Sequence, residues 1–215
     1  MKYLSYRYLY PCRPANAISP EDLNMWENQS MVGQLKTNGS NTLFFTNGET
    51  LRVIGRHNQL LTNFGISKDE IIENLYKPLN LNGNWLVLNG ETLNKSKQDE
   101  RGITFNQKFI LFDILVFDSD YLVGKTFGER INLLDNLYGQ KTSSKEYLYG
   151  ISENIFRVKS YNTGFKNLFD TYTKIDLVEG LVLKRTNAKL EIATSEKNNW
   201  RSQIKCRKET KNYKY

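Results

Sequence analysis

The segment from Lys108 to Phe117 is the strongest strand in the sequence and limits the possible folds most tightly. Its residues are mainly Ile, Leu, Val and Phe, a composition typical of a strand inside a core. Asp113 interrupts this apolar run. An acid in such a strand requires a partner or a chemical role, because an unpaired buried charge is costly.

Shorter elements surround this strand without a regular alternation of strand and helix. The expected strands are 41–46, 50–56, 85–88, 155–158, 178–184, 190–193 and 201–207. The expected helices are 19–27, a short one opened by Ser67, 126–137 and 165–172. Asn47-Gly48 predicts a hairpin turn, and Asn89-Gly90 is expected to end strand 85–88. This mixture predicts an α+β fold with mostly antiparallel sheets.

Composition and charge limit the class of protein. The 215 residues fit one domain, and 13 Tyr with 11 Phe favour a sheet-rich core. The formal net charge of +7 favours a polyanionic partner such as nucleic acid, although proteins that bind nothing acidic also carry such an excess. Residues 208–215 form a basic tail.

Other residue types exclude several kinds of site. Two cysteines, Cys12 and Cys206, do not make a disulfide framework, so a reducing, cytoplasmic location is expected. No run approaches the roughly 20 apolar residues of a membrane span, so no membrane partner is expected. His57 is the sole histidine, which excludes multi-histidine metal sites and most catalytic triads.

Two runs far apart in the sequence suggest a reactive lysine. Lys36-Thr37-Asn38-Gly39-Ser40-Asn41 places an amine where a strand meets a turn. An amine that attacks phosphorus must first lose its proton, and nearby cations and burial both favour that loss. Glu179-Gly180-Leu181-Val182-Leu183-Lys184 adds an acid and a second amine on one strand. Alone, the first run is more often a solvated turn.

Further candidates lie at or near other strands. Glu91 and Glu179 are expected at strand ends, where acids can hold magnesium or a ribose hydroxyl. Phe112 can stack on a base or pack in the core. Lys205 and Arg207 share one face of a strand, which suits a triphosphate or an exposed edge.

Taken together and in order, these runs resemble the covalent nucleotidyltransferase superfamily: ATP-dependent DNA ligases, RNA ligases and messenger-RNA capping enzymes. That superfamily carries Lys-x-Asp-Gly, an arginine about twenty residues later, Gly-Glu, aromatic-Asp, Glu-Gly-x-Val-x-Lys and Lys-x-Lys. The corresponding elements here are Lys36, Arg56, Gly90-Glu91, Phe112-Asp113, Glu179 to Lys184, and Lys205-Cys206-Arg207. The resemblance spans about Gln34 to Arg207. It implies an adenylyltransferase (ATP-grasp-like) domain of mostly antiparallel sheets flanked by helices, occupying residues 1–215 without an OB domain.

Within the superfamily, the closing Asn41 and the run Ile204-Lys205-Cys206 are most similar to RNA ligases of the phage and RNA-editing kind. Residues 124–137 are instead similar to the matching segment of DNA ligases and capping enzymes. Asn38 replaces the usual aspartate or histidine, and Arg207 replaces lysine, which keeps the charge but changes its geometry. A compact ligase for RNA repair, as in a virus acting in the host cytoplasm, fits this pattern.

The resemblance implies a role for each site residue. Lys36 would form lysyl-AMP from ATP with Mg²⁺ or Mn²⁺, with Glu179 and Lys205 as its catalytic partners. The metal would be held by Glu179, Glu91 and Asp113. The nucleotide and phosphates would contact Gln34, Leu35, Lys36, Asn41, Arg56, Glu91, Phe112, Lys184, Lys205 and Arg207. Among these, Phe112 would stack on adenine, Glu91 would bind ribose, and Lys205 and Arg207 would hold phosphates.

Several alternatives stay open from the sequence. The expected partner is a nucleic-acid end, RNA rather than DNA, bound by a monomer, with a separate partner domain or protein as an option. Gln34 can donate or accept at the base, so GTP and a capping-type guanylyltransferase are a rival reading. A DNA ligase is a second rival. The non-enzymatic alternative is a degenerate nucleotidyltransferase domain that only binds nucleic-acid ends.

Overall fold

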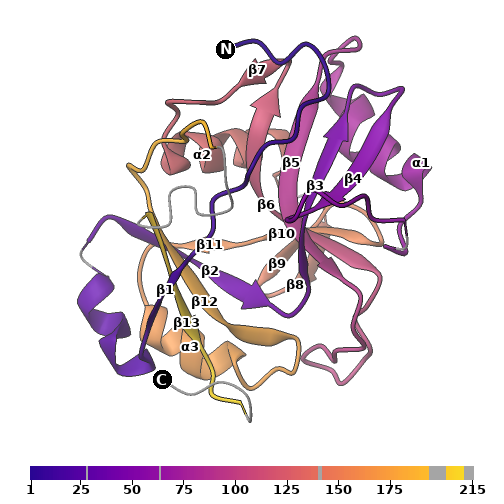
Figure 1. The fold of residues 1–215 in the computed structure, drawn as a ribbon. Helices are drawn as coiled ribbons and strands as arrows, with labels where there is room; N and C mark the ends of the chain where they lie inside the picture. Colours follow the sequence, from indigo (N-terminus) through magenta and orange to yellow (C-terminus); the bar gives the residue numbers. More distant parts are fainter. Residues whose placement is uncertain (28, 63, 140–141, 194–201, 211–215) are drawn as a thin grey trace.

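Two β-sheets form the framework of the protein (Figure 1). The computed structural model describes residues 1–27, 29–62, 64–139, 142–193 and 202–210. The five-stranded sheet has the order β1 (Asn16–Ile18), β13 (Gln203–Arg207), β12 (Val178–Arg185), β2 (Met31–Thr37) and β11 (Ser160–Tyr161). Its pairings are antiparallel except β1 with β13, so β1 runs alongside the strand that carries Lys205.

The eight-stranded sheet contains the predicted core strand. Its order is β4 (Leu51–Gly55), β3 (Ser40–Thr46), β5 (Leu86–Leu93), β6 (Lys108–Phe117), β10 (Ile155–Val158), β9 (Leu148–Gly150) and β8 (Thr142–Lys145), with β7 (Asp120–Tyr121) also paired to β6. Only β10 and β6 pair in parallel among the described strands of this sheet. The prediction of mostly antiparallel sheets is therefore confirmed.

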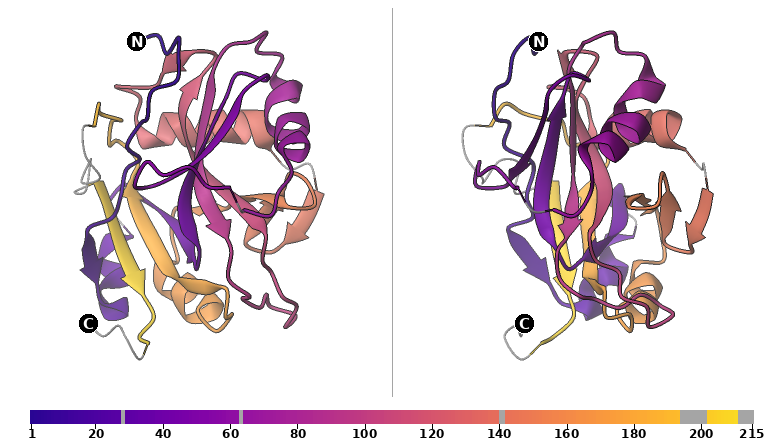
Figure 2. Two further views of the ribbon diagram at one scale, coloured as in Figure 1. Left: turned by 45° about the vertical axis from the view of Figure 1, so that its right-hand side comes forward. Right: turned by 90° about the vertical axis from the view of Figure 1, so that its right-hand side faces the viewer.

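Short helices cover the sheets (Figure 2). They are η1 (Pro20–Trp26), α1 (Lys68–Ile71), η2 (Ile72–Tyr76), η3 (Lys77–Leu79), α2 (Phe127–Tyr138) and α3 (Phe165–Tyr172). Three of these helices begin with a side-chain N-cap: Ser19, Ser67 and Thr126 each accept a hydrogen bond from a backbone N–H of the first turn. α2 buries Leu134 and Tyr138 in the core of the eight-stranded sheet, and α3 buries Phe165 and Phe169 beneath the five-stranded sheet. No described helix is long and apolar enough to span a bilayer.

The chain crosses from one sheet to the other after Thr37, the residue that follows Lys36. β2 belongs to the five-stranded sheet and β3 to the eight-stranded sheet, and only Asn38 and Gly39 separate them. A Cβ on Gly39 would lie 2.4 Å from the backbone oxygen of Thr92, so this close crossing requires glycine. Lys36 is consequently held at the boundary between the two sheets.

Two strand predictions are wrong. Strand 85–88 was expected to end at Asn89-Gly90, but β5 continues to Leu93 through a bulge between these two residues. Gly90 serves packing rather than a turn, because a Cβ there would lie 2.3 Å from Cζ of Phe109. Residues 190–193 form no strand; Leu190 instead exchanges backbone hydrogen bonds with the 124–125 loop. Arg201, the expected start of the last strand, lies outside the described residues, as do residues 211–215 of the basic tail.

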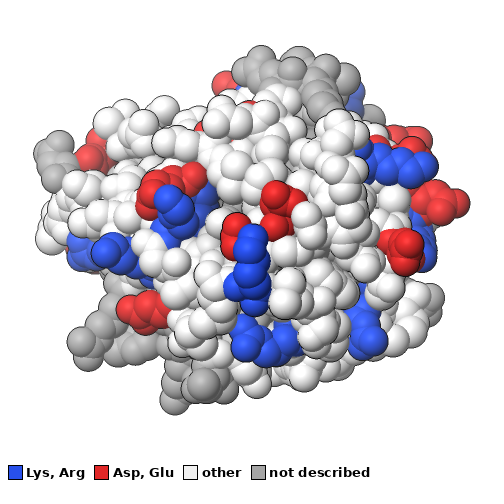
Figure 3. Space-filling view, turned by 90° about the horizontal axis from the view of Figure 1, so that it is seen from above, with Lys and Arg blue, Asp and Glu red and all other residues white. Residues whose placement is uncertain are grey.

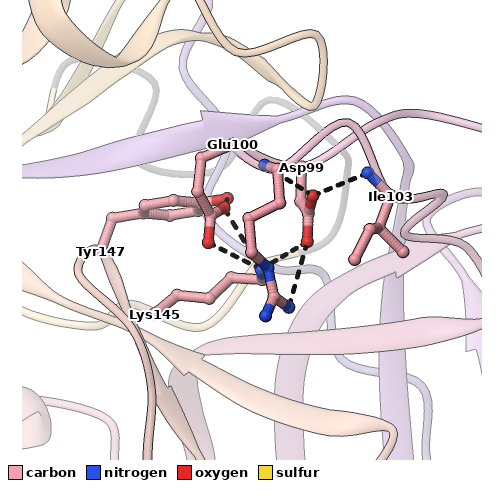
Figure 4. A network of polar contacts seen from close by, with 6 residues as sticks. Asp99, Glu100, Ile103, Lys145 and Tyr147 are labelled. Carbon is pink, nitrogen blue, oxygen red and sulfur yellow. Dashed lines mark hydrogen bonds and ion pairs between the residues drawn. The ribbon is translucent and has the colours of Figure 1, made fainter.

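An ionic network centred on buried Asp99 and Lys145 joins the long loop between β5 and β6 to the end of β8 (Figure 4). Lys145 Nζ lies 2.7 Å from Asp99 Oδ2 and 2.9 Å from Glu100 Oε1, and the Tyr147 hydroxyl donates to Glu100. Backbone N–H groups of Arg101 and Ile103 donate to the other Asp99 oxygen. Burial acts to raise the pKa of Asp99, but the bonds from Lys145 and these N–H groups outweigh it and lower that pKa to about 2.

Candidate active site

A cavity of about 540 Å³ lies where the two sheets meet. Its walls come from β2, β12 and β13 of one sheet and from β3, β5 and β6 of the other. Most of the predicted site residues line it: Gln34, Leu35, Lys36, Asn41, Arg56, Glu91, Phe112, Lys184, Lys205 and Arg207. Residues separated by up to 173 positions in the sequence (34 and 207) are thus gathered by the two sheets.

Glu179 reaches this cavity through its ion pair with Lys36. β2 and β12 are antiparallel neighbours with Lys36 opposite Gly180, and the register shifts between Val178 and Gly180. The bulge therefore falls at Glu179 and turns its side chain toward the amine. Gly180 has φ +152°, and a Cβ there would lie 1.9 Å from the backbone oxygen of Cys206, so only glycine fits.

Cations surround the Lys36–Glu179 pair. Arg207 Nη2 lies 3.6 Å from Glu179 Oε2, and Lys205 precedes it on the same face of β13. Partial burial together with the charges of Arg207, Arg13 and Lys36 lowers the pKa of Lys205. Such mutual repulsion is relieved when an anion binds, so this side of the cavity suits phosphate groups.

Glu91 lies on the opposite wall, inside β5 rather than after a strand as predicted. It faces Asn41 across the β3–β5 ladder. Burial raises the pKa of Glu91 to about 7; Lys36 opposes this increase, and the charge of Glu179 adds to it. The charges of Lys36, Arg56 and Glu179 thus all act on Glu91.

Two buried amide oxygens in the cavity wall lack a hydrogen-bond partner among the described residues. Gln34 Nε2 donates to Ser160 Oγ at 3.0 Å, which leaves Gln34 Oε1 without a donor. Asn41 Oδ1 is also buried without a hydrogen-bond donor among the described residues. A buried acceptor without a partner costs about 1–3 kcal/mol. Both positions are therefore suited to a ligand that brings hydrogen-bond donors.

Lys184 is almost fully buried between two aromatic rings. Its Nζ lies 4.6 Å from the centroid of the Phe112 ring and 4.7 Å from that of Phe127. Burial lowers the pKa of Lys184 to about 8, against the opposing charge of Asp113. The Phe112 ring is also part of the cavity wall, so an aromatic surface and an amine lie side by side there.

The structure does not bring Asp113 to the cavity. Its oxygens lie 2.9 and 3.0 Å from Nε and Nη2 of Arg130, and both side chains are buried. Successive residues of a strand face opposite sides, so Phe112 in the cavity wall directs Asp113 toward α2. The predicted metal role of Asp113 has no geometric support. Among the described residues, no group of three or more His, Cys, Asp and Glu side chains could hold a metal by itself.

Residues 11–14 also line the cavity, and sequence reasoning missed them. This segment, Pro11-Cys12-Arg13-Pro14, precedes the first motif and has no helical or strand periodicity. A cation between two prolines was its sole unusual feature. His57 and Gln59, which follow Arg56, line the cavity as well.

Comparison with known proteins gives consistent results. The sequence profile described as RNA ligase matches residues 29–206. No curated protein matches the chain. Mycobacterial DNA ligase D complexed with ATP and MES is similar in fold, with a TM-score of 0.63 and 17% identity over 93% of this chain and 60% of that one.

Two further solved structures share the fold. The ligase domain of M. tuberculosis LigD has a TM-score of 0.63 and 18% identity, covering 92% of this chain and 60% of that one. A Lig E DNA ligase has a TM-score of 0.54 and 17% identity, covering 92% of this chain and 68% of that one. The chain therefore spans about 60% of the length of the two LigD structures. Among its described residues, the two sheets and their helices account for the fold, with no OB barrel.

Proposed function

The chain belongs to the RNA ligase family, and on that premise we propose that it is an ATP-dependent RNA ligase that works through a lysyl-AMP intermediate at Lys36. The observation that carries the proposal is the Lys36–Glu179 ion pair, which lies in a cation-rich cavity large enough for a nucleotide. A solvated turn lysine would have neither this partner nor these neighbours.

In the first step, Lys36 Nζ attacks the α-phosphorus of ATP. An N–P bond forms, the bond from phosphorus to the bridging oxygen breaks, and pyrophosphate leaves. The amine must give up its proton, and Glu179 is the hydrogen-bonded acceptor beside it. Lys205 and Arg207 would stabilise the phosphate charge, because their cationic groups face the same space.

The second and third steps transfer AMP and seal the ends. An oxygen of a 5′-phosphate end attacks the lysyl-bound phosphorus, the N–P bond breaks, and an adenylylated end forms. A 3′-hydroxyl then attacks the end phosphate and expels AMP, while its proton passes to solvent. Arg56 lines the cavity beyond β4 and would bind the 5′-phosphate. A separate domain or protein would complete the grip on the nucleic acid.

Gln34 supports ATP rather than GTP as the donor. Its Nε2 is engaged by Ser160, so Oε1 is the group available to a base. Adenine presents an amino donor at its six position, which an acceptor oxygen can bind. Guanine presents a carbonyl there, which Gln34 Oε1 would repel. Phe112 would stack on the same base.

A divalent cation fits the acids of the cavity. Glu179 and Glu91 offer hard oxygen donors, and Mg²⁺ in phosphate-transfer sites is held by one or two carboxylates together with substrate phosphates. Bound there, Mg²⁺ or Mn²⁺ would neutralise phosphate charge.

The test is covalent labelling with α-labelled ATP or α-labelled GTP in the presence of magnesium. Wild-type protein should acquire label from ATP, and peptide mapping should place it on Lys36. Lys36→Ala should lose all label, whereas Lys77→Ala, at a side chain that is 61% exposed, should keep it. Full labelling of Lys36→Ala would refute the nucleophile, and label from GTP alone would favour a capping enzyme. Sealing assays with 5′-phosphorylated RNA and DNA then decide the substrate.

A further inference from the structure

Residues 8–18 run as a strap between the two sheets. Figure 1 shows the N-terminal trace descending across the front of the eight-stranded sheet to β1 beside β13. At its upper end, the Tyr8 hydroxyl lies 2.9 Å from the backbone oxygen of Arg56 and 3.2 Å from that of Gly55. At its lower end, Ala17 pairs with Lys205 in the parallel β1–β13 ladder. The strap is thus attached to both cation-bearing walls of the cavity.

The middle of the strap contributes a cation to the cavity. Arg13 lies between Pro11 and Pro14, and all three line the cavity. Proline restricts the backbone on both sides of this arginine, so the strap positions Arg13 with less conformational freedom than an ordinary terminal segment would have.

The cavity contains many more cations than acids. Among the described residues, its lining carries Arg13, Lys36, Arg56, Lys184, Lys205 and Arg207 but only one carboxylate, that of Glu91, with Glu179 bound to Lys36 behind it. The outer face seen in Figure 3 differs, because positive and negative side chains lie interspersed over it. The charge of Arg13 acts directly on Lys205, which links the strap to the phosphate side of the site.

We propose that Arg13 binds a phosphate group of the substrate and closes the cation cluster from the strap side. The assignment of the site as a ligase centre rests on the function proposed above, whereas the binding of an anion rests on the charges and placement of the lining residues. The phosphate can belong to the triphosphate of ATP or to the 5′-phosphate of a nucleic-acid end. Both would be bound as an oxyanion by the guanidinium fork.

The experiment compares Arg13→Gln with Arg7→Gln, an exposed arginine of the same N-terminal segment outside the cavity lining. Binding of ATP and of tripolyphosphate is measured by calorimetry without metal, and labelling and AMP transfer are measured separately. Loss of one charge-assisted contact weakens binding about tenfold. Arg13→Lys should recover part of the loss, because it keeps the charge without the fork.

Each outcome assigns the phosphate or removes the proposal. Weaker tripolyphosphate binding with slower labelling assigns Arg13 to the triphosphate. Normal labelling with slower transfer from preformed enzyme–AMP to a 5′-phosphorylated oligonucleotide assigns it to the end phosphate. Arg13→Gln that matches Arg7→Gln in every measurement overturns the proposal. Wild-type protein that fails to label refutes the proposed function instead, while the tripolyphosphate comparison still decides the role of Arg13.

Discussion

Gln34 shows how a single hydrogen bond can select a base. Ser160 occupies the Nε2 end of the amide at 3.0 Å and leaves the oxygen end buried in the cavity wall. Because an amide can rotate and exchange its donor for its acceptor, the preference for adenine depends on Ser160 as well as on Gln34. Sequence alone left both bases open, since the partner lies 126 residues away.

Ser160→Ala should relax this selection. Without the hydroxyl, the Gln34 amide can turn its NH₂ group toward the base, so the ratio of ATP to GTP labelling should fall by about threefold to tenfold. Gln34→Leu should instead reduce ATP labelling about tenfold without improving GTP use. The measurement is initial labelling rate at several nucleotide concentrations. An unchanged ratio in Ser160→Ala would contradict this account of the base pocket.

Glu91 predicts a pH-dependent stability. Burial raises its pKa from 4.5 in the unfolded chain to about 7, so the folded protein favours the protonated form. The stabilisation this gives is fully present below pH 4.5 and is lost as pH rises through 7. Glu91→Gln should therefore gain stability relative to wild type as pH rises through this range, reaching about 3 kcal/mol at pH 8. Urea denaturation at pH 5, 6, 7 and 8 measures the difference in unfolding free energy between Glu91→Gln and wild type. A difference that stays constant with pH would exclude Glu91 as the source of the pH dependence.

At the scale of elements, local pattern predicted those strands and helices whose ends are set locally. β6, β10 and α3 have the predicted bounds, because each has a strong local pattern of apolar residues with clear flanking residues. β5 was predicted too short, since Asn-Gly resembles a turn, and only the packing against the Phe109 ring and the Ile110 backbone oxygen explains why glycine stands in mid-strand. The order of the motifs predicted residues that line the cavity. It did not predict the strap of residues 8–18, because the position of the strap depends on contacts with both sheets.

In the ionic network that holds the β5–β6 loop, removal of one charged partner should destabilise the protein because it leaves the other charge buried and unpaired. Lys145→Met leaves Asp99 buried without its main cation and should cost about 3 kcal/mol of unfolding free energy. The double variant Lys145→Met with Asp99→Asn should lose much less, because no unpaired charge stays buried. Chemical denaturation of the single and double variants tests this. Equal losses in both would mean that packing rather than charge stabilises the loop.

At the scale of the whole molecule, the cavity lies between two sheets, and each sheet contributes positively charged side chains to it. Lys36, Lys205 and Arg207 come from the five-stranded sheet, and Arg56 follows β4 of the eight-stranded sheet. A polyanion that contacts the cations of both sheets binds only the folded protein, because the unfolded chain does not bring these cations together. Its binding therefore stabilises the whole folded domain. A salt that only screens these charges lacks this bridging effect.

Tripolyphosphate should consequently raise the melting temperature far more than sodium chloride at equal ionic strength. At one hundred times its dissociation constant, a ligand adds about 2.7 kcal/mol to stability. For a domain of this size, that corresponds to a rise of roughly 5–10 °C. Scanning calorimetry should show one transition that moves upward with concentration, and the shift should be smaller in Arg13→Gln than in Arg7→Gln. A shift no larger than that of chloride would show that the cations of the two sheets do not hold a common phosphate ligand.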